Sequence, residues 1–279
     1  MSYLISITLL WAFSFSLIGV YLAGQVDAWF SVFIRIALAT LLFLPFLKRT
    51  PFRLAFKLML IGAVQLGIMY SFYYHSFLFL SVPEVLLFTV MTPLYITLLN
   101  DALNHYFNPK FFVVAFIAVL GAVTIRYETL DSNFLIGLLL VQGANISFAI
   151  GQVSYKRLMI GKNVDDKALF GWFFIGALVI ATICFALFGN TEKLPQTPTQ
   201  WGILTYLGVI ASGIGYFMWN KGATQVNVGA LAVMNNLLIP AGIIVNIVIW
   251  NREADILRLA IGASVMLFAL VLNHLIAKK

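Results

Sequence analysis

Long apolar runs constrain this chain most, because each one is long enough to cross a lipid bilayer as a helix. A spanning helix needs about 20 mostly apolar residues, since each rises about 1.5 Å across a hydrocarbon core of about 30 Å. The runs lack the alternating pattern of a membrane β-barrel, so the sequence predicts an all-α membrane protein. There are ten runs, with approximate bounds 4–23, 28–47, 56–79, 83–100, 110–126, 133–155, 168–189, 201–223, 228–250 and 256–276.

Composition and the connections between runs exclude other classes. The chain has 62% hydrophobic and 10% charged residues, whereas soluble domains carry about 25% charged residues. Its most polar connections, Lys48–Lys57, Lys156–Lys167 and Asn190–Gln200, are too short for a soluble domain. The first run lacks the basic flank and cleavage site of a signal peptide. We therefore expect a multi-pass protein of a bacterial-type plasma (inner) membrane, surrounded by membrane lipid, with no nucleic-acid partner.

The basic residues favour one orientation in the membrane. If the N-terminus is inside, the inner segments hold twelve of the 17 lysines and arginines and the outer segments hold four, while Arg35 lies within the second run. Seven of the ten acidic residues then lie outside. Short cytoplasmic loops collect Lys and Arg, so both termini are predicted to be cytoplasmic. Topology thus explains the net charge of +7.

A weak internal repeat divides the chain into halves. An offset of 147 residues places Ser76–Tyr127 on Ala223–His274 and Pro93 on Pro240. Each half has five runs, and an odd number inverts the second half relative to the first. The connection after the second run has four basic residues, whereas its counterpart after the seventh has one. Inverted repeats are typical of secondary transporters. The predicted repeats are residues 1–131 and 132–279.

Short motifs along both halves match the pattern of a known family. Leu10-Trp11-Ala12 resembles its Trp-small motif, Arg35 matches its helix 2 arginine, and Tyr74 to Pro93 resembles its helix 3–4 hairpin. A second copy runs from Trp219 to Pro240. Through these motifs the whole chain resembles the EamA-type ten-helix exporters of the drug/metabolite transporter superfamily. The resemblance implies two inverted five-helix repeats and transport of a small molecule.

Other positions refine or depart from this resemblance. Glu253 lies where the family often has Gly-Glu, but Arg252 replaces the glycine, and His105-Tyr106 stands at the matching place in the first half. The stretch from Asn235-Asn236 onward is similar to bacterial carboxylate, amino-acid and amine transporters. These diffuse motifs identify a superfamily and only suggest a substrate class.

Uncharged polar and aromatic side chains within the runs are the candidate substrate site. Helical spacing places Gln142 and Asn145 on one face, for example. Buried polar groups mark either helix packing or a site, so interhelical hydrogen bonding and aromatic packing are the alternative for each residue. The predicted substrate-binding residues are Trp11, Gln65, Tyr70, Tyr74, Gln142, Asn145, Tyr216, Trp219, Asn235 and Asn236.

Arg35, Pro93 and Pro240 are predicted to serve gating or structure. Arg35 lies roughly 10 Å inside its run, at about 1.5 Å per residue. It can pair with a substrate carboxylate, or it can snorkel or cap carbonyl groups of a neighbouring helix. The resemblance places an arginine here across different substrates, which favours the structural role. Each proline removes a backbone hydrogen bond and favours a bend, either a hinge or a static kink.

The sequence lacks several groups that proton coupling, metal binding or ATP use would require. No acidic residue lies in the middle of a run, and only His75 and Glu84, near helix ends, are candidates for proton coupling. We therefore expect weak or absent proton coupling, while a sodium site made of carbonyl groups stays open. The single cysteine, Cys184, excludes a cysteine metal cluster. No phosphate-binding loop is present, so we expect no ATP drive, no cofactor and no metal ion.

These features predict a transporter and not an enzyme. His75, His105 and His274 are scattered, and the sequence has no His-Glu-x-x-His motif. We expect a secondary transporter that moves a small amphipathic metabolite (amino acid, amine or carboxylate) across the inner membrane by alternating access, as an exporter or exchanger. The alternative is a lipid or lipophilic drug translocator of the same fold. The expected state is a monomer or homodimer.

Overall fold

The computed structural model is helical throughout the residues that it describes and contains no strand among them. These residues are 2–105, 132–161, 166–226 and 228–250, with isolated positions between 113 and 120 and between 257 and 275. Within 228–250, the side chains at 228–230, 232, 233, 236 and 240 lie outside the described set.

Seven helical segments in this part of the chain are long and apolar enough to cross a membrane. They are Ser2–Leu22, Ala28–Phe46, Phe52–Ser76, Val82–Leu103, Ser132–Met159, Asp166–Phe188 and Pro198–Thr224. The helix α12 (Val228–Trp250) contains a shorter apolar stretch, Leu237–Trp250. These segments match eight of the ten predicted runs to within a few residues. The runs at 110–126 and 256–276 lie outside the described residues, apart from isolated positions.

Five of these segments change helix type along their length, and the other long helices are regular. The regular helices are α8 (Ser132–Met159), α9 (Asp166–Phe188) and α12, and η6 (Thr191–Lys193) is a short 3₁₀ turn. Three of the composite segments contain a π-helical stretch: α1 (Ser2–Leu17) with η1 (Ile18–Leu22); α3 (Phe52–Gly62), η3 (Ala63–Ile68) and α4 (Met69–Ser76); and α10 (Pro198–Thr205), η7 (Tyr206–Ile214) and α11 (Gly215–Thr224). The other two contain a 3₁₀ turn: α2 (Ala28–Phe43) with η2 (Leu44–Phe46); and α5 (Val82–Phe88), η4 (Thr89–Met91) and α6 (Thr92–Leu103).

Polar side chains at the helix ends begin several of these elements. The Asp27 carboxylate accepts a hydrogen bond from the Phe30 amide at 2.7 Å and caps α2. Glu84 accepts hydrogen bonds from the amide and hydroxyl groups of Ser81, both at 2.7 Å, in a capping box that begins α5. Such caps satisfy amide groups that lack a partner inside the helix. Glu84 thus has a local structural role at the helix end where the sequence placed it.

Pro93 stands where the Val82–Leu103 segment changes helix type. The 3₁₀ turn η4 ends at Met91, and α6 begins at Thr92 with Pro93 in its first turn. Proline lacks the amide donor of a continuous helix and is tolerated in the first turn. The α-helix is therefore interrupted beside Pro93, while a hinge role stays a prediction. At Pro240, α12 is one helix, and the side chain lies outside the described set.

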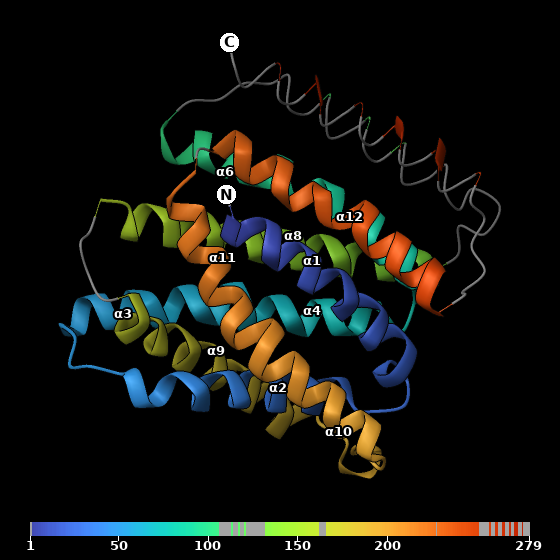
Figure 1. Ribbon diagram of the computed structural model, residues 1–279, viewed down its shortest axis with the longest axis horizontal. Coiled ribbons are helices and arrows are strands. Elements are labelled where there is room, and N and C mark those ends of the chain that lie inside the picture. The colour runs from blue at the N-terminus through green and yellow to red at the C-terminus, as the bar shows by residue number, and fades with distance from the viewer. Residues whose placement is uncertain are drawn as a thin grey trace.

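Helices from the two halves of the chain pack against one another in matching pairs (Figure 1). The helix α1 packs on α12 and α11, and α8, which holds the equivalent place in the second half, packs on α6 and α4. Likewise, α2 packs on η7, and α9 packs on η3. The helices α2 and α9 also contact each other. Each half therefore forms its core largely with the other half.

Two glycines set the distance between α3 and α9, one of the most extensive helix contacts. A Cβ atom built at Gly62 would lie 1.8 Å from the Phe173 carbonyl oxygen, and one at Gly176 would lie 1.9 Å from the Met59 carbonyl oxygen. Neither position has room for a methyl group, because the obstacle is backbone. Small residues let membrane helices approach this closely, and the gain is in van der Waals contact.

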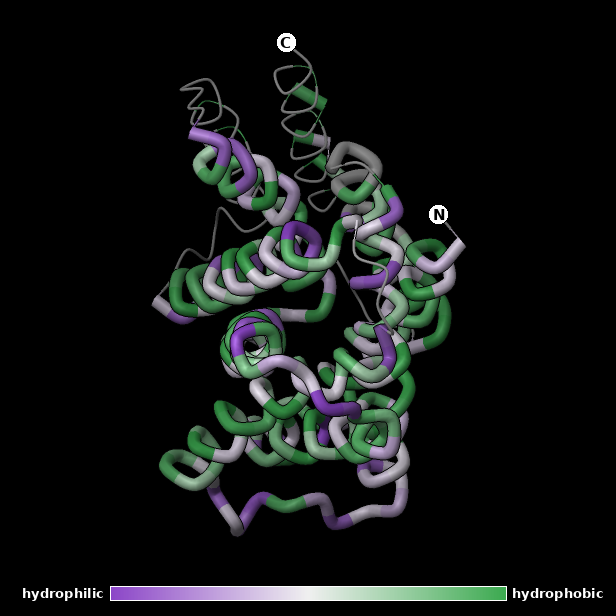
Figure 2. The backbone as a smooth tube through the Cα atoms, turned by 90° about the vertical axis from the view of Figure 1, so that its left-hand side faces the viewer, coloured by the Kyte–Doolittle hydropathy of each residue, from purple (hydrophilic) through white to green (hydrophobic). Residues whose placement is uncertain are grey.

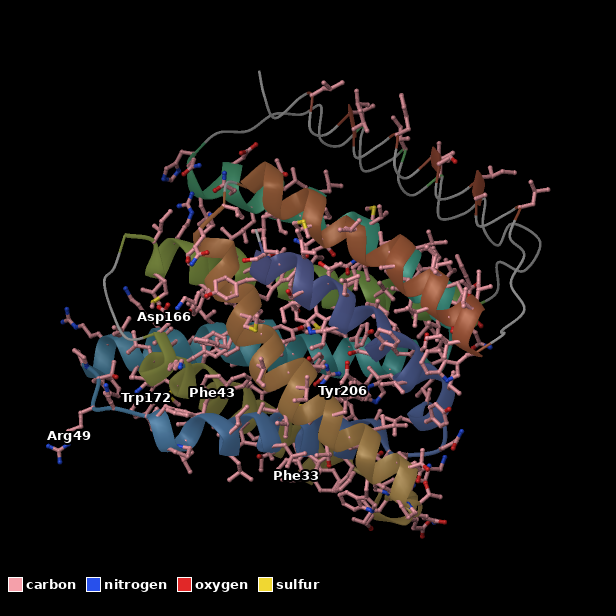
Figure 3. The ribbon with its side chains drawn as sticks, in the orientation of Figure 1. Phe33, Phe43, Arg49, Asp166, Trp172 and Tyr206 are labelled. Atoms are coloured by element: carbon pink, nitrogen blue, oxygen red, sulfur yellow. The ribbon has the colours of Figure 1, made fainter. Side chains whose placement is uncertain are left out.

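One end of the bundle carries most of the described basic residues and is called the basic end below; they are Lys48, Arg49, Arg53, Lys57, Lys156, Arg157, Lys167 and Lys221. Lys221 pairs with Asp166 across α11 and α9, with 3.5 Å between Nζ and Oδ2. Trp172 donates to the Thr50 hydroxyl at 3.1 Å. Figure 3 shows Arg49, Asp166 and Trp172 on this side. Seen from this end, hydrophilic residues gather in turns and helix ends (Figure 2).

The opposite end of the bundle holds the other ends of these helices. The Asp27 amide donates to the Lys193 carbonyl oxygen at 2.8 Å, which links the start of α2 to η6. Trp250, at the end of α12, donates to the Tyr21 hydroxyl at 3.3 Å. Consecutive described spans therefore run in opposite directions between the two ends, except for Val82–Leu103 and Ser132–Met159, which both end at the basic end and are separated by residues outside the described set.

We predict that Gly62→Ala and Gly176→Ala each lower the melting temperature of the detergent-purified protein, because a methyl group forces α3 and α9 apart. The expected loss in the free energy of unfolding is about 1–3 kcal/mol. Gly202→Ala is the matched control, since a Cβ atom there meets nothing within 4 Å. Equal melting temperatures for Gly176→Ala and Gly202→Ala would contradict the close contact.

Candidate functional site

A cavity lies at the centre of the bundle, where helices from both halves meet. The cavity volume is about 90 Å³, which is below the roughly 300–1,000 Å³ of common small-molecule sites. The residues that line it come from α1, η1, α2, α4, η4, α6, α8, α11 and α12. They are Trp11, Ser14, Phe15, Ile18, Arg35, Met69, Tyr70, Tyr73, Thr89, Thr92, Ala144, Asn145, Phe148, Tyr216, Asn235 and Leu238.

Aromatic rings form much of the wall. The ring centroids of Trp11 and Tyr216 lie 4.8 Å apart, and Tyr216 meets Tyr70 edge-on at 5.8 Å. Phe15 and Tyr73 form another edge-to-face pair at 5.3 Å. Such contacts hold aromatic side chains in fixed positions and add to the energy of burial. The wall therefore offers rigid apolar faces with phenol and indole groups at their edges.

Arg35 is the cation in this wall and is only 2% exposed. Its Nε donates to the Leu207 carbonyl oxygen at 3.1 Å and to the Ser212 hydroxyl at 2.5 Å. Its Nη1 donates to the Tyr74 hydroxyl at 3.2 Å. The guanidinium carbon lies 4.2 Å from the centroid of the Tyr70 ring, in cation–π geometry. These contacts fix the guanidinium from several sides.

The π-helical stretch η7 supplies backbone acceptors to this wall. The Ala211 carbonyl oxygen accepts a hydrogen bond from Trp11 Nε1 at 2.8 Å, and the Leu207 carbonyl oxygen accepts from Arg35. A π-helical turn shifts the regular hydrogen-bond pattern, and such turns occur often at functional sites. Gly208 lets α2 come close, since a Cβ atom there would lie 3.1 Å from the Arg35 carbonyl oxygen.

Asn145 contributes an amide to the cavity. Its Nδ2 donates to the Phe88 carbonyl oxygen at 2.9 Å and to Gln142 Oε1 at 3.2 Å. Gln142 Oε1 also accepts from the Tyr95 hydroxyl at 3.1 Å. Both amide hydrogens of Asn145 are thus engaged, and its Oδ1 has no hydrogen bond with the described residues. This oxygen can accept a hydrogen bond from a ligand.

Five of the ten predicted substrate-binding residues line the cavity: Trp11, Tyr70, Asn145, Tyr216 and Asn235. Two more hold lining residues in place, since Tyr74 binds Arg35 and Gln142 binds Asn145. Arg35, predicted as a gating or structural residue, also lines the cavity. Whether these residues bind a substrate stays a prediction.

The other predicted residues lie elsewhere. Gln65 is fully buried, and its Nε2 donates to Asn220 Oδ1 at 3.2 Å. Trp219 packs behind Trp11, with 4.9 Å between the ring centroids. For these two, the packing interpretation describes the observed contacts. The side chains of Asn236 and Pro240 lie outside the described set.

Several lining residues were not among the predicted set. Thr89 is the first residue of the 3₁₀ turn and Thr92 follows it, beside Pro93, where the regular α-helical periodicity is interrupted. Phe148 lies one helical turn beyond Ala144, and this pair shows which face of α8 is turned to the cavity. Polar residues next to a mid-helix proline were the available sequence signal for the threonines. The remaining missed residues are Ser14, Phe15, Ile18, Met69, Tyr73 and Leu238.

A second hollow lies at the basic end, between α6, α8 and α12. Its cations are engaged by the protein, because Lys156 donates to the carbonyl oxygens of Ala223 and Val226, and Arg157 donates to Asn104. It has no aromatic lining residue. The central cavity is therefore the stronger candidate site. The second hollow is lined by Ile96, Asn100, Asn104, Val153, Lys156, Arg157, Ile160 and Leu231.

Comparison with known families assigns the fold. The EamA-like transporter family matches residues 1–127 and 135–275, which together make up nearly the whole chain. The chain belongs to the EamA-like transporter family. This membership confirms the resemblance derived from the sequence motifs. It also agrees with the prediction of a multi-pass membrane transporter in place of an enzyme.

Individual relatives are similar over almost their full length. The chain is 51% identical over 273 residues to the biotin transporter of Salmonella typhimurium, with 97% of this chain and 91% of the relative covered. The biotin transporter of Escherichia coli is 50% identical over the same coverage. The probable biotin transporter of Pseudomonas aeruginosa is 49% identical over 279 residues, covering 99% and 98% of the two chains.

A solved crystal structure shares the fold of this EamA-like chain. It superposes with a TM-score of 0.71 at 17% sequence identity, covering 99% of this chain and 97% of the other. At this identity the similarity shows the fold alone.

The predicted substrate class needs correction. The stretch from Asn235 suggested amino acids, amines or carboxylates, whereas the relatives at about 50% identity are named for biotin. The relatives' names do not support the motif-based assignment to amino acids or amines, because the matching positions lie along helices, where helix packing constrains residue type as strongly as the substrate does.

We predict that the cavity admits a small water-soluble thiol reagent. In a Cys184→Ser background, Thr89→Cys should react with a charged methanethiosulfonate, because Thr89 lines the cavity and is partly exposed. Thr8→Cys is the matched control, since both hydroxyls bond to a carbonyl group of their own helix but Thr8 is fully buried. Mass spectrometry measures the modification, and equal reaction of the two variants would argue against the cavity.

Proposed function

We propose that this protein is a secondary transporter that moves biotin across the bacterial plasma (inner) membrane by alternating access. The observation that carries the proposal is identity of about 50% over nearly the full length to transporters named for biotin. About half of the aligned positions are identical, and the alignment covers nearly all of both chains. The proposed site is the central cavity.

The chemistry of the cavity suits biotin. Biotin has a compact fused ring with a ureido group, an apolar chain and a terminal carboxylate. The rings of Trp11, Tyr216 and Phe148 provide faces for the ring and the chain. The free Asn145 Oδ1 is an acceptor for a ureido N–H group. These groups support a ligand that is apolar in its middle and polar at both ends.

Alternating access requires two parts that move around the site. We assign these parts to two inverted five-helix repeats, residues 1–131 and 132–279, in a ten-helix fold. Three observations support the assignment. The family matches once in each half, the halves pack in equivalent helix pairs, and the π-helical η3, moved by the 147-residue offset, overlaps η7. In secondary transporters, related halves rock about a site near the bilayer midplane.

The basic end is proposed to face the cytoplasm, because Lys and Arg accumulate in cytoplasmic connections. Both termini would then be cytoplasmic. The relatives' names give no direction of flux, so export or exchange stays a prediction from the sequence. Weak or absent proton coupling stays a prediction as well.

Transport in proteoliposomes tests the function. We expect protein reconstituted in phosphatidylethanolamine and phosphatidylglycerol to accumulate tritiated biotin above protein-free liposomes, and excess unlabelled biotin to abolish the signal. Amino acids and amines should not compete. Competition by amino acids, or movement of lipids or dyes without biotin, would reject the proposal and favour one of the other substrate classes.

Cysteine labelling tests the orientation. In a Cys184→Ser background, Lys193→Cys should react with a membrane-impermeant maleimide on intact cells. Arg49→Cys, at the basic end, should react only after the cells are permeabilised. The reverse pattern would place the basic end outside.

A further inference from the structure

Arg35 is a buried cation that lacks an acidic partner. It is 2% exposed, and no carboxylate of the described residues lies within ion-pair distance of it. The acidic side chains in this part of the chain lie near helix ends, for example Asp27, Glu84 and Asp166. A buried charge is costly unless it is paired, so a cation held in this way calls for a counter-charge.

The groups that surround Arg35 orient it without neutralising it. Leu207, Ser212 and Tyr74 are uncharged, and together they occupy Nε and one hydrogen of Nη1. Tyr70 covers the face of the guanidinium. The four groups act as a cradle that fixes the plane of the guanidinium. An arginine that only capped helix carbonyl groups would bind backbone oxygens. Of the contacts made by Arg35, only the one to Leu207 is with a backbone oxygen.

One edge of the guanidinium is left free. Nη2 makes no hydrogen bond with any described residue. It is also not one of the fully buried polar atoms without a partner, so part of its surface is open. The central cavity, which Arg35 lines, is the open space next to this side chain. The N–H groups of Nη2 can donate to the oxygens of a carboxylate, the anion that a guanidinium group pairs with most readily in proteins.

We propose that Arg35 binds the carboxylate of the transported substrate and thereby selects anionic ligands. The inference rests on the proposed biotin transport, in which the ligand carboxylate is that of the biotin side chain. The substrate supplies the counter-charge that the described residues do not. Asn145, which offers its acceptor oxygen from α8, would bind the ureido end, so the two residues would orient the ligand across the cavity.

This role predicts discrimination between ligands that differ only in charge. A neutral tail leaves the buried guanidinium unpaired, and sites built for a polar group reject analogues that lack it. Biotin amide has the ring and chain of biotin with an uncharged end. We expect the purified wild-type protein to bind biotin amide roughly tenfold or more weakly than biotin. Thermal stabilisation over a concentration series of each ligand measures both affinities.

Variants separate this role from a structural one. Arg35→Gln should weaken the binding of biotin by roughly tenfold or more and leave the binding of biotin amide almost unchanged. The ratio of the two affinities should then approach one. Arg35→Lys should keep part of the preference, because it retains the charge without the bidentate geometry. Asn145→Ala is the matched control. It should weaken both ligands by a similar factor and keep the wild-type ratio.

The outcomes are distinguishable. Equal binding of biotin and biotin amide by the wild type overturns the role of Arg35 and leaves the proposed function intact. An equal loss of both ligands in Arg35→Gln also overturns it, because that result indicates a structural role. A wild type that neither binds nor transports biotin overturns the proposed function and this inference together. The wild-type comparison decides the question even if Arg35→Gln does not fold.

Discussion

The contact between α2 and the π-helical stretch η7 is the interaction on which the centre of this protein depends. Polar backbone groups inside a membrane must be satisfied within the protein. Here the carbonyl groups of Leu207 and Ala211 accept hydrogen bonds from the side chains of Arg35 and Trp11, respectively, which come from two other helices. Gly208 permits the close approach. One irregular turn therefore holds both a cation and an aromatic ring at the wall of the cavity.

The cavity combines three kinds of group that rarely coexist in a membrane interior. Aromatic rings provide apolar faces, Asn145 provides an acceptor oxygen, and Arg35 provides a positive charge. Each is held by contacts with other groups of the protein, so little side-chain freedom is lost when a ligand enters. A ligand with an apolar middle, a hydrogen-bonding ring and an anionic end complements this arrangement, and biotin has these features.

The candidate site was predicted in part, and the errors follow from helix geometry. Gln65 was predicted to bind the substrate, yet its side chain binds Asn220, whereas Met69, four residues later, lines the cavity. Gln65 lies within the π-helical η3 and Met69 directly follows it, and a π-helical turn changes the angle from residue to residue. Thr89 and Thr92 were missed where the helix becomes a 3₁₀ turn. Where the helix stays regular, as at Asn145 in α8, the prediction found a lining residue.

The sequence by itself predicted the helical membrane class, the seven apolar spans of the described residues and the family, because span length and apolarity are imposed by the bilayer on every helix. Its motifs did not determine the substrate, since they act mainly through packing. Only the tertiary structure decided which polar residues share a cavity and which are buried in helix contacts. That choice depends on helix rotation, which local π and 3₁₀ turns and glycine contacts set. Arg35 shows the difference: the sequence placed a charge in the membrane, and the fold placed that charge in the wall of the cavity.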